Sequence, residues 1–188
     1  MPAPIRTPRE RWVDAGLQAL AAHGPIGVRI EVLAEQLGVT KGGFYGQFAN
    51  RDDFLEALLD AWEKRSTDDV LAEVEGRDDA RERIQRAGAL TFAKDLLPID
   101  LAVRFWARSD RAVAARLRRV DNRRMTYLRE QFATLIDDPD EIEARSTLAF
   151  SLAIGQQLMA VDHGPRSRRQ AVALATSALL STDRARRG

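Results

Sequence analysis

The sequence predicts an all-α fold of about nine helices. Apolar residues recur at the spacing of one helix face, as they do over residues 30–37. From residue 79 to residue 188, no segment shows the alternation of apolar and polar side chains that is typical of a half-buried strand. Glycine and proline separate the helical segments, for example at Gly24-Pro25. Together these features predict helices throughout.

The composition is that of an ordinary helical protein. Of the 188 residues, 45% are hydrophobic and 30% are charged, and the net charge is +1. Any binding to nucleic acid must therefore come from a local patch and not from bulk charge. The absence of cysteine excludes disulfides, thiolate metal sites and cysteine nucleophiles. Neither a signal core nor a run of about 18 apolar residues is present, so we expect a cytoplasmic protein without a membrane partner.

The first helix is predicted to begin at a capping box and to end at a glycine–proline pair. Thr7 stands at the cap and Glu10 three residues later, with Pro8 at the first helical position. Gly24-Pro25 is predicted to end the helix.

Two short helices joined by a tight turn are predicted between Arg29 and Phe48. Gly38 is expected to end the first of them, because glycine adopts a left-handed conformation at little cost. Thr40 can cap the second by accepting a bond from a free backbone N–H. This is a helix-turn-helix arrangement, in which the second helix enters the DNA major groove.

The second of these helices has little side chain on its outer face. Gly42 and Gly43 are adjacent, although each glycine inside a helix costs roughly 0.5–1 kcal/mol relative to alanine. We interpret the bare backbone as a means of close approach to phosphates and base edges. Lys41 supplies charge and Tyr45 supplies a hydroxyl group, while Phe44 is expected to face inward.

The segment LAEQLGVTKGGFYGQFANRDDFLEALL resembles the DNA-binding signature of TetR-type bacterial transcriptional regulators. The GVTKGGFY core and the F-x-N-R-D-x-F-L run carry the match, which extends over residues 9–62. The resemblance implies a helix-turn-helix DNA-binding domain over residues 1–52 and a larger helical domain over residues 53–188 for effector binding and dimerisation. Gly46 and Gln47 depart from the family pattern, so the sequence preference of relatives does not carry over.

The resemblance also implies a mechanism. A homodimer places its two recognition helices in successive major grooves, about 34–36 Å apart, on a near-palindromic double-stranded DNA operator. A small-molecule effector then releases the DNA by binding the two conformers with different affinities. The residues expected to contact DNA, or to permit its close approach, are Arg29, Thr40, Lys41, Gly42, Gly43, Tyr45, Gln47 and Arg51. For Arg29, the alternative is a solvated surface arginine.

The remaining helices are predicted from apolar spacing and breaks. Asn50 is expected to cap a helix over residues 51–74, and further helices are expected over 80–95, 99–108 and 110–135. The effector pocket implied by the resemblance draws on this region, although plain core packing is the alternative for each residue. The candidates are Trp62, Leu90, Phe92, Leu97, Phe105, Trp106, Met125, Tyr127 and Met159.

The last two helices, over residues 147–161 and 171–180, are apolar nearly all round. A helix buries its whole circumference only when it has neighbours on both sides, which predicts a four-helix dimer interface with two helices from each subunit. Helices buried inside a single chain are the alternative. The interface residues expected are Leu148, Leu152, Gly155, Met159, Ala171, Leu174 and Ala178.

No catalytic constellation is evident. The sequence has no G-x-S-x-G, P-loop or H-E-x-x-H motif, and its two histidines, His23 and His163, lie far apart along the chain. No catalytic residue, metal site or cofactor is therefore predicted. The function predicted is a ligand-responsive repressor. An activator or a regulator controlled by a protein partner is the first alternative, and a helical enzyme or carrier with a fortuitous helix-turn-helix is the second.

Overall fold

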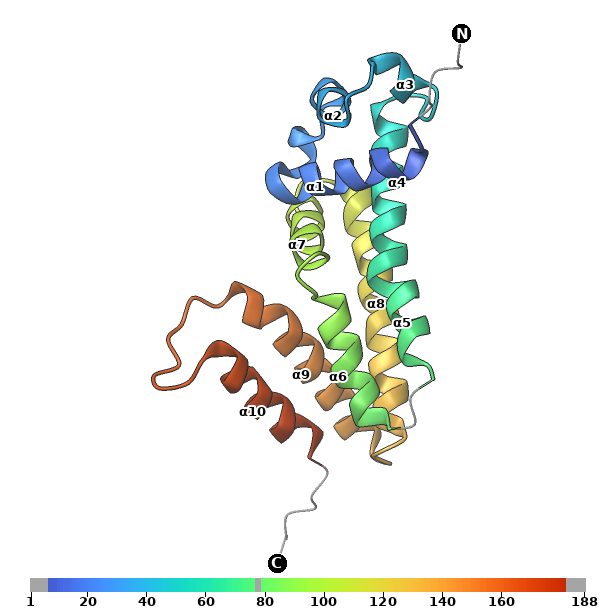
Figure 1. The fold of residues 1–188 in the computed structure, drawn as a ribbon. Helices are drawn as coiled ribbons and strands as arrows, with labels where there is room; N and C mark the ends of the chain where they lie inside the picture. Colours follow the sequence, from blue (N-terminus) through green and yellow to red (C-terminus); the bar gives the residue numbers. More distant parts are fainter. Residues whose placement is uncertain (1–6, 77–78, 182–188) are drawn as a thin grey trace, which may run out of the picture. The chain divides into compact units, whose positions relative to one another are not determined.

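The computed structural model describes residues 7–76 and 79–181, and every regular element in these ranges is helical (Figure 1). The α-helices are α1 (Arg9–Gly27), α2 (Ile30–Leu37), α3 (Lys41–Tyr45), α4 (Arg51–Glu63), α5 (Asp69–Val74), α6 (Ala80–Thr91), α7 (Leu97–Trp106), α8 (Arg111–Ala133), α9 (Pro139–Leu158) and α10 (Arg168–Leu180). A π-helical turn, Lys64–Asp68, joins α4 to α5. The helix predicted over 51–74 is thus α4, this turn and α5 in succession, and the all-α fold class is confirmed.

The first helix differs from its prediction at its start but not at its end. Thr7 does not cap it: Pro8 occupies the cap position and no side chain accepts a bond there. Gly24 has φ 67° and ψ −171°, a combination that is essentially restricted to glycine, and it kinks the helix. Only a short helical stretch, from Pro25 to Gly27, follows, so the long regular part of α1 does end at the Gly24-Pro25 pair, as predicted.

The chain forms two compact units. The first comprises the described residues up to Val70 together with Thr91–Val120, and the second comprises Leu71–Leu90 and the described residues from Asp121 onward. The domain boundary predicted after residue 52 follows the expected functions of the two parts of the chain and does not coincide with these compact units. It stays a prediction.

The first unit is built around α1, which packs against both α4 and α7. Trp12 and Leu20 of α1 and Leu58 and Trp62 of α4 are completely buried. Gly16 allows the two helices to lie close together, since a Cβ atom at this position would lie 2.5 Å from the Phe54 ring. The core of this unit therefore fixes α4 beneath the helix-turn-helix segment.

Charge pairs also join α8 to α4 in the first unit. The Arg116 guanidinium contacts Glu56 at 2.9 Å and lies within ion-pair distance of Asp60 and Glu63. Arg119 forms a second pair with Glu63, at 2.8 Å. Two arginines of α8 therefore pair with carboxylates of α4 in the same chain.

The second unit holds α6, the last turns of α8, α9 and α10. Ile84, Phe132 and Leu180 form its small buried core. The α9 helix begins at Pro139 and not near residue 147, because Asp138 caps it by accepting from the Asp140 N–H. The Ser167–Gln170 capping box starts α10. None of the helices within residues 7–76 and 79–181 combines the length and the hydropathy that crossing a bilayer requires.

Candidate DNA-binding surface

The turn between α2 and α3 has the geometry that the sequence predicts. Gly38 lies in the left-handed region at φ 68°, and its N–H bonds to the carbonyl oxygens at the end of α2. Thr40 occupies the cap position of α3, but its side chain makes no capping hydrogen bond, so that expectation is wrong. The hydroxyl group of this exposed threonine is left on the outer surface of the turn.

The recognition helix α3 is held in place by one buried ring. Phe44 is completely buried and contacts Trp12 edge-on, with 5.4 Å between ring centroids. It stacks on Phe48 at 5.1 Å and meets Phe54 edge-on at 5.3 Å. Because these partners come from α1, α4 and the end of the α3 segment, the orientation of this five-residue helix depends on tertiary contacts.

The opposite side of α3 is open to solvent. Tyr45 is 59% exposed, and Lys41 and Gly42 are exposed as well. A Cβ atom at Gly42 would lie 3.6 Å from the nearest heavy atom, and one at Gly43 would lie 3.9 Å away, both ordinary contact distances. The packing of the protein itself therefore does not require glycine at either position. This is the pattern expected where a second molecule approaches the backbone.

Lys41 carries an ion pair within the helix-turn-helix. Its Nζ donates to Glu31 Oε1 of α2 at 2.9 Å, and both side chains are more than half exposed. The hydrogen bond from Lys41 lowers the pKa of Glu31 below its usual value. A phosphate group would compete with this carboxylate for the lysine. Glu31 was not predicted from the sequence as part of this surface, although an acidic residue on the helix that precedes Lys41 indicates a possible ion-pair partner.

The other residues predicted to contact DNA differ in whether their side chains already form hydrogen bonds within the protein. Arg29 precedes α2 and is exposed. The Nε2 of Gln47 donates to the Thr7 carbonyl at 3.1 Å. Arg51 donates from Nε to the Val28 carbonyl at 3.1 Å and from Nη2 to the Pro25 carbonyl. Arg51 therefore ties the start of α4 to the segment between α1 and α2.

The match to a family model covers this part of the chain. Residues 13–58, which run from α1 into α4, match the model described as bacterial regulatory proteins, tetR family. Residues 13–58 therefore form a TetR-type helix-turn-helix DNA-binding domain. Members of the TetR family are transcriptional regulators and not enzymes, and the helix-turn-helix is their DNA-binding element. The comparison with curated proteins found no match to this sequence.

Solved structures share the fold of this chain. A putative TetR-family transcriptional regulator from a Rhodococcus species is 24% identical with a TM-score of 0.64, covering 91% of this chain and 95% of that one. A putative regulator from Saccharomonospora viridis, in complex with choline, is 21% identical with a TM-score of 0.72, covering 91% and 92%. AibR, in complex with isovaleryl coenzyme A and operator DNA, is 13% identical with a TM-score of 0.64, covering 90% and 96%.

The residues expected to line an effector pocket are divided between the two compact units. Trp62, Phe92, Leu97, Phe105 and Trp106 belong to the first unit, whereas Leu90, Met125, Tyr127 and Met159 belong to the second. Trp62 is completely buried, and its Nε1 donates to the equally buried Asp100 at 3.2 Å.

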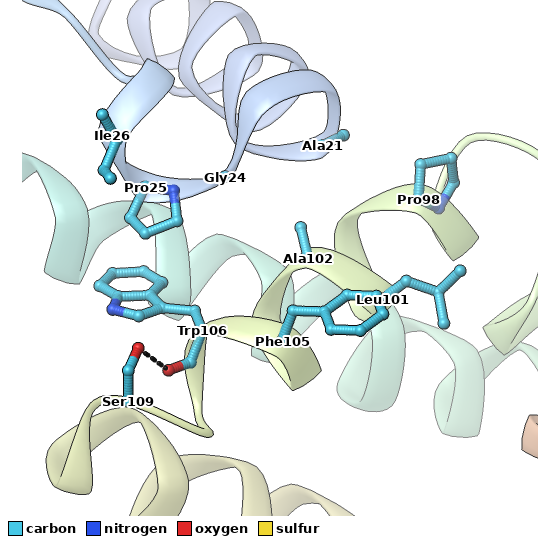
Figure 2. A pocket seen from close by; sticks show the side chains of 10 residues that line it. All are labelled: Ala21, Gly24, Pro25, Ile26, Pro98, Leu101, Ala102, Phe105, Trp106 and Ser109. Carbon is cyan, nitrogen blue, oxygen red and sulfur yellow. Dashed lines mark hydrogen bonds between the residues drawn. The ribbon is translucent and has the colours of Figure 1, made fainter.

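Phe105 and Trp106 do line a pocket, which lies between α1 and α7 and has a volume of about 570 Å³. Figure 2 shows the α1 residues on one side of it and the α7 residues on the other. The residues that α1 contributes to this pocket were not predicted from the sequence. The residues that line it are Ala21, Gly24, Pro25, Ile26, Pro98, Leu101, Ala102, Phe105, Trp106 and Ser109.

The residues expected at the dimer interface lie on α9, on α10 and just after α9. Leu148, Leu174 and Met159 are 59%, 57% and 48% exposed, and Ala178 is exposed as well. Leu152, Gly155 and Ala171 are partly buried. Large apolar side chains are thus left in solvent by this single chain. Within residues 7–76 and 79–181, no group of three or more histidine or acidic side chains could hold a metal ion.

Proposed function

We propose that this TetR-family regulator is a repressor that binds a near-palindromic operator as a homodimer and is released by a small-molecule effector. The observation that carries the proposal is the two-sided character of α3. Phe44 packs one side of α3 into the core, while Lys41, Gly42 and Tyr45 are exposed to solvent on the other side. Phosphate contacts would orient the domain, and contacts to base edges would give specificity.

The exposed apolar residues of α9 and α10 support the homodimer. Leu148 and Leu174 are each more than half exposed on helices that pack against one another. Exposed apolar residues on adjacent helices mark surfaces that associate with another protein. Two such helices from each subunit form a four-helix interface.

Two observations support effector control. The pocket between α1 and α7, at about 570 Å³, falls in the range of about 300–1,000 Å³ typical of small-molecule sites. The AibR structure also holds both operator DNA and isovaleryl coenzyme A. An effector acts on DNA binding only if its affinity differs between the two conformers.

The test is fluorescence anisotropy with labelled DNA from the region upstream of the gene, with scrambled DNA of the same length as reference. We expect selective binding that weakens steeply with salt, because counterions are released from the phosphates. Lys41→Ala should weaken binding and lower the salt slope by about one. Tyr45→Ala should weaken binding as well.

Lys64→Ala is the matched control, because it removes the same charge from an exposed position in the π-helical turn. It should bind as the parent does. If Lys41→Ala and Tyr45→Ala, folded as judged by circular dichroism, also bind as the parent does, the assignment of α3 is wrong. If the parent binds both DNAs equally and weakly, a genome-wide selection of bound fragments should be used to find its operator. Failure to enrich any fragment would refute the proposed function.

A further inference from the structure

The end of α1 carries exposed apolar side chains that face α7 across a pocket. Ile26, in the turn after the Gly24 kink, is 85% exposed, and Phe105 of α7 is 60% exposed. Both line the pocket of about 570 Å³ that Figure 2 shows. Its neighbour Trp106 is partly buried and packs against the core of this unit, whereas Phe105 is mostly exposed. Packing in the core of this unit therefore does not explain why large apolar side chains occupy these two positions.

The chemistry of the pocket defines the class of molecule that it could take. Its lining includes Pro25, Leu101 and the two aromatic rings, and it contains no charged side chain. The one side-chain hydroxyl, that of Ser109, already donates to the Trp106 carbonyl at 3.2 Å (Figure 2). Burial of apolar area is then the main source of affinity, and aromatic rings add offset or edge-on ring contacts. An uncharged aromatic molecule fits these properties.

One wall of the pocket is bonded to the DNA-binding element. The Pro25 carbonyl accepts from Arg51 Nη2, and the Val28 carbonyl accepts from Arg51 Nε at 3.1 Å. Arg51 is the first residue of α4 and follows the recognition helix directly after a short turn. A molecule that displaces Pro25 and Ile26 from α7 must therefore also displace the acceptors of Arg51.

We propose that this pocket is a regulatory site for an uncharged, aromatic small molecule, and that occupancy reaches α3 through the Pro25–Arg51 contact. The inference rests on the proposed function, because it assigns the effector site of the regulator. It places that site against the DNA-binding helices. The bound molecule favours the conformer in which the Arg51 bonds to the turn of residues 25–28 are rearranged, and by linkage DNA and effector weaken each other equally.

The binding test uses N-phenyl-1-naphthylamine, an uncharged fluorescent aromatic compound, titrated into the full chain. We expect saturable binding to the parent and a loss of affinity of about tenfold in Phe105→Ala and in Ile26→Ser. Both side chains are mostly exposed, so neither change should unfold the protein. Leu158→Ala is the control, because Leu158 is 60% exposed but lies outside the pocket. Absence of binding to the parent, or equal affinity in all four proteins, overturns the site.

The coupling test is an NMR measurement of the Arg51 Nε–Hε resonance, assigned by its loss in Arg51→Lys. Saturation with the compound should shift this resonance in the parent. At a compound concentration near the Kd of the parent, the shift should be several-fold smaller in Phe105→Ala, because its weaker affinity leaves less of that variant occupied. A resonance that stays in place while the compound binds the parent refutes the coupling.

A DNA measurement separates this inference from the proposed function. If the parent binds its operator, the compound should raise the apparent Kd for DNA, and DNA should raise the apparent Kd for the compound by the same factor. If the parent binds no DNA, the proposed function fails, while the fluorescence and NMR results still decide whether the pocket exists and contacts Arg51. Unchanged DNA affinity at saturating compound refutes regulation through this pocket.

Discussion

The Nζ of Lys41 lies 2.9 Å from Glu31 Oε1, so the one lysine of the recognition helix is paired to the helix that precedes it. The pair is exposed and would contribute little to folding. Its consequence concerns DNA, because the carboxylate holds the cation that a phosphate would otherwise bind. The lowered pKa of Glu31 keeps this carboxylate charged throughout the neutral range. We therefore expect no change in this competition between about pH 6 and pH 8.

Glu31→Gln should increase operator affinity, because Lys41 is then available to phosphate without losing a partner. We expect a gain of about two- to fivefold at low salt, shrinking as salt rises. Fluorescence anisotropy against the operator measures it. Glu35→Gln removes the same charge from an exposed position on the same helix but leaves the Lys41–Glu31 pair intact, so its gain should be smaller. Equal gains in both variants would mean that only net charge matters.

Asp100→Ala should strongly destabilise the first unit. Asp100 is completely buried, accepts from Trp62 Nε1 at 3.2 Å and pairs with Arg104 at 2.8 Å. Removing the carboxylate leaves a buried indole N–H and a largely buried guanidinium without this acceptor, at a cost of about 3–5 kcal/mol in the free energy of unfolding. Urea denaturation followed by tryptophan fluorescence measures the loss. Asp100→Asn keeps an acceptor for Trp62 and should lose less; an equal loss would show that the charge alone matters.

Gly16→Ala should destabilise the protein, whereas Gly88→Ala should stabilise it. A Cβ atom at Gly16 would lie 2.5 Å from Phe54 and 2.8 Å from Leu58, so α1 and α4 must move apart, at a cost of about 1–3 kcal/mol. At Gly88, within α6, an added Cβ atom would meet nothing within 4 Å beyond its chain neighbours and the backbone of its own helix, and alanine should gain roughly 0.5–1 kcal/mol. Thermal unfolding measures both. A stabilised Gly16→Ala variant would contradict the close packing of α1 on α4.

Leu174→Arg should dissociate the proposed homodimer. Leu174 is 57% exposed on α10, so the change should leave the single chain folded, whereas a charge buried in a dimer interface carries a large desolvation cost. Sedimentation velocity would detect monomer at concentrations where the parent is dimeric. Val32→Arg, at another exposed apolar residue in α2, is the control and should stay dimeric. A dimeric Leu174→Arg variant would place the interface elsewhere.

The sequence alone determined the helical fold and the position of the helix-turn-helix. Periodicity identified α2, and the left-handed Gly38 was predictable because few other residues adopt that conformation cheaply. Asn50 was correctly predicted as the cap of α4, where it accepts from Asp53 N. These features depend on interactions within a few residues along the chain, which sequence patterns record directly.

Only the tertiary structure decided what the side chains of those elements contact. Arg51, expected at phosphate, bonds to carbonyls more than twenty residues away, and Trp62, expected in a pocket, is a buried donor to Asp100. The pocket between α1 and α7 depends on the kink at Gly24, whose dihedral angles the Gly24-Pro25 pair did not reveal. Contacts between segments distant in sequence depend on how helices pack, and periodicity shows which face is apolar but not which neighbour covers it.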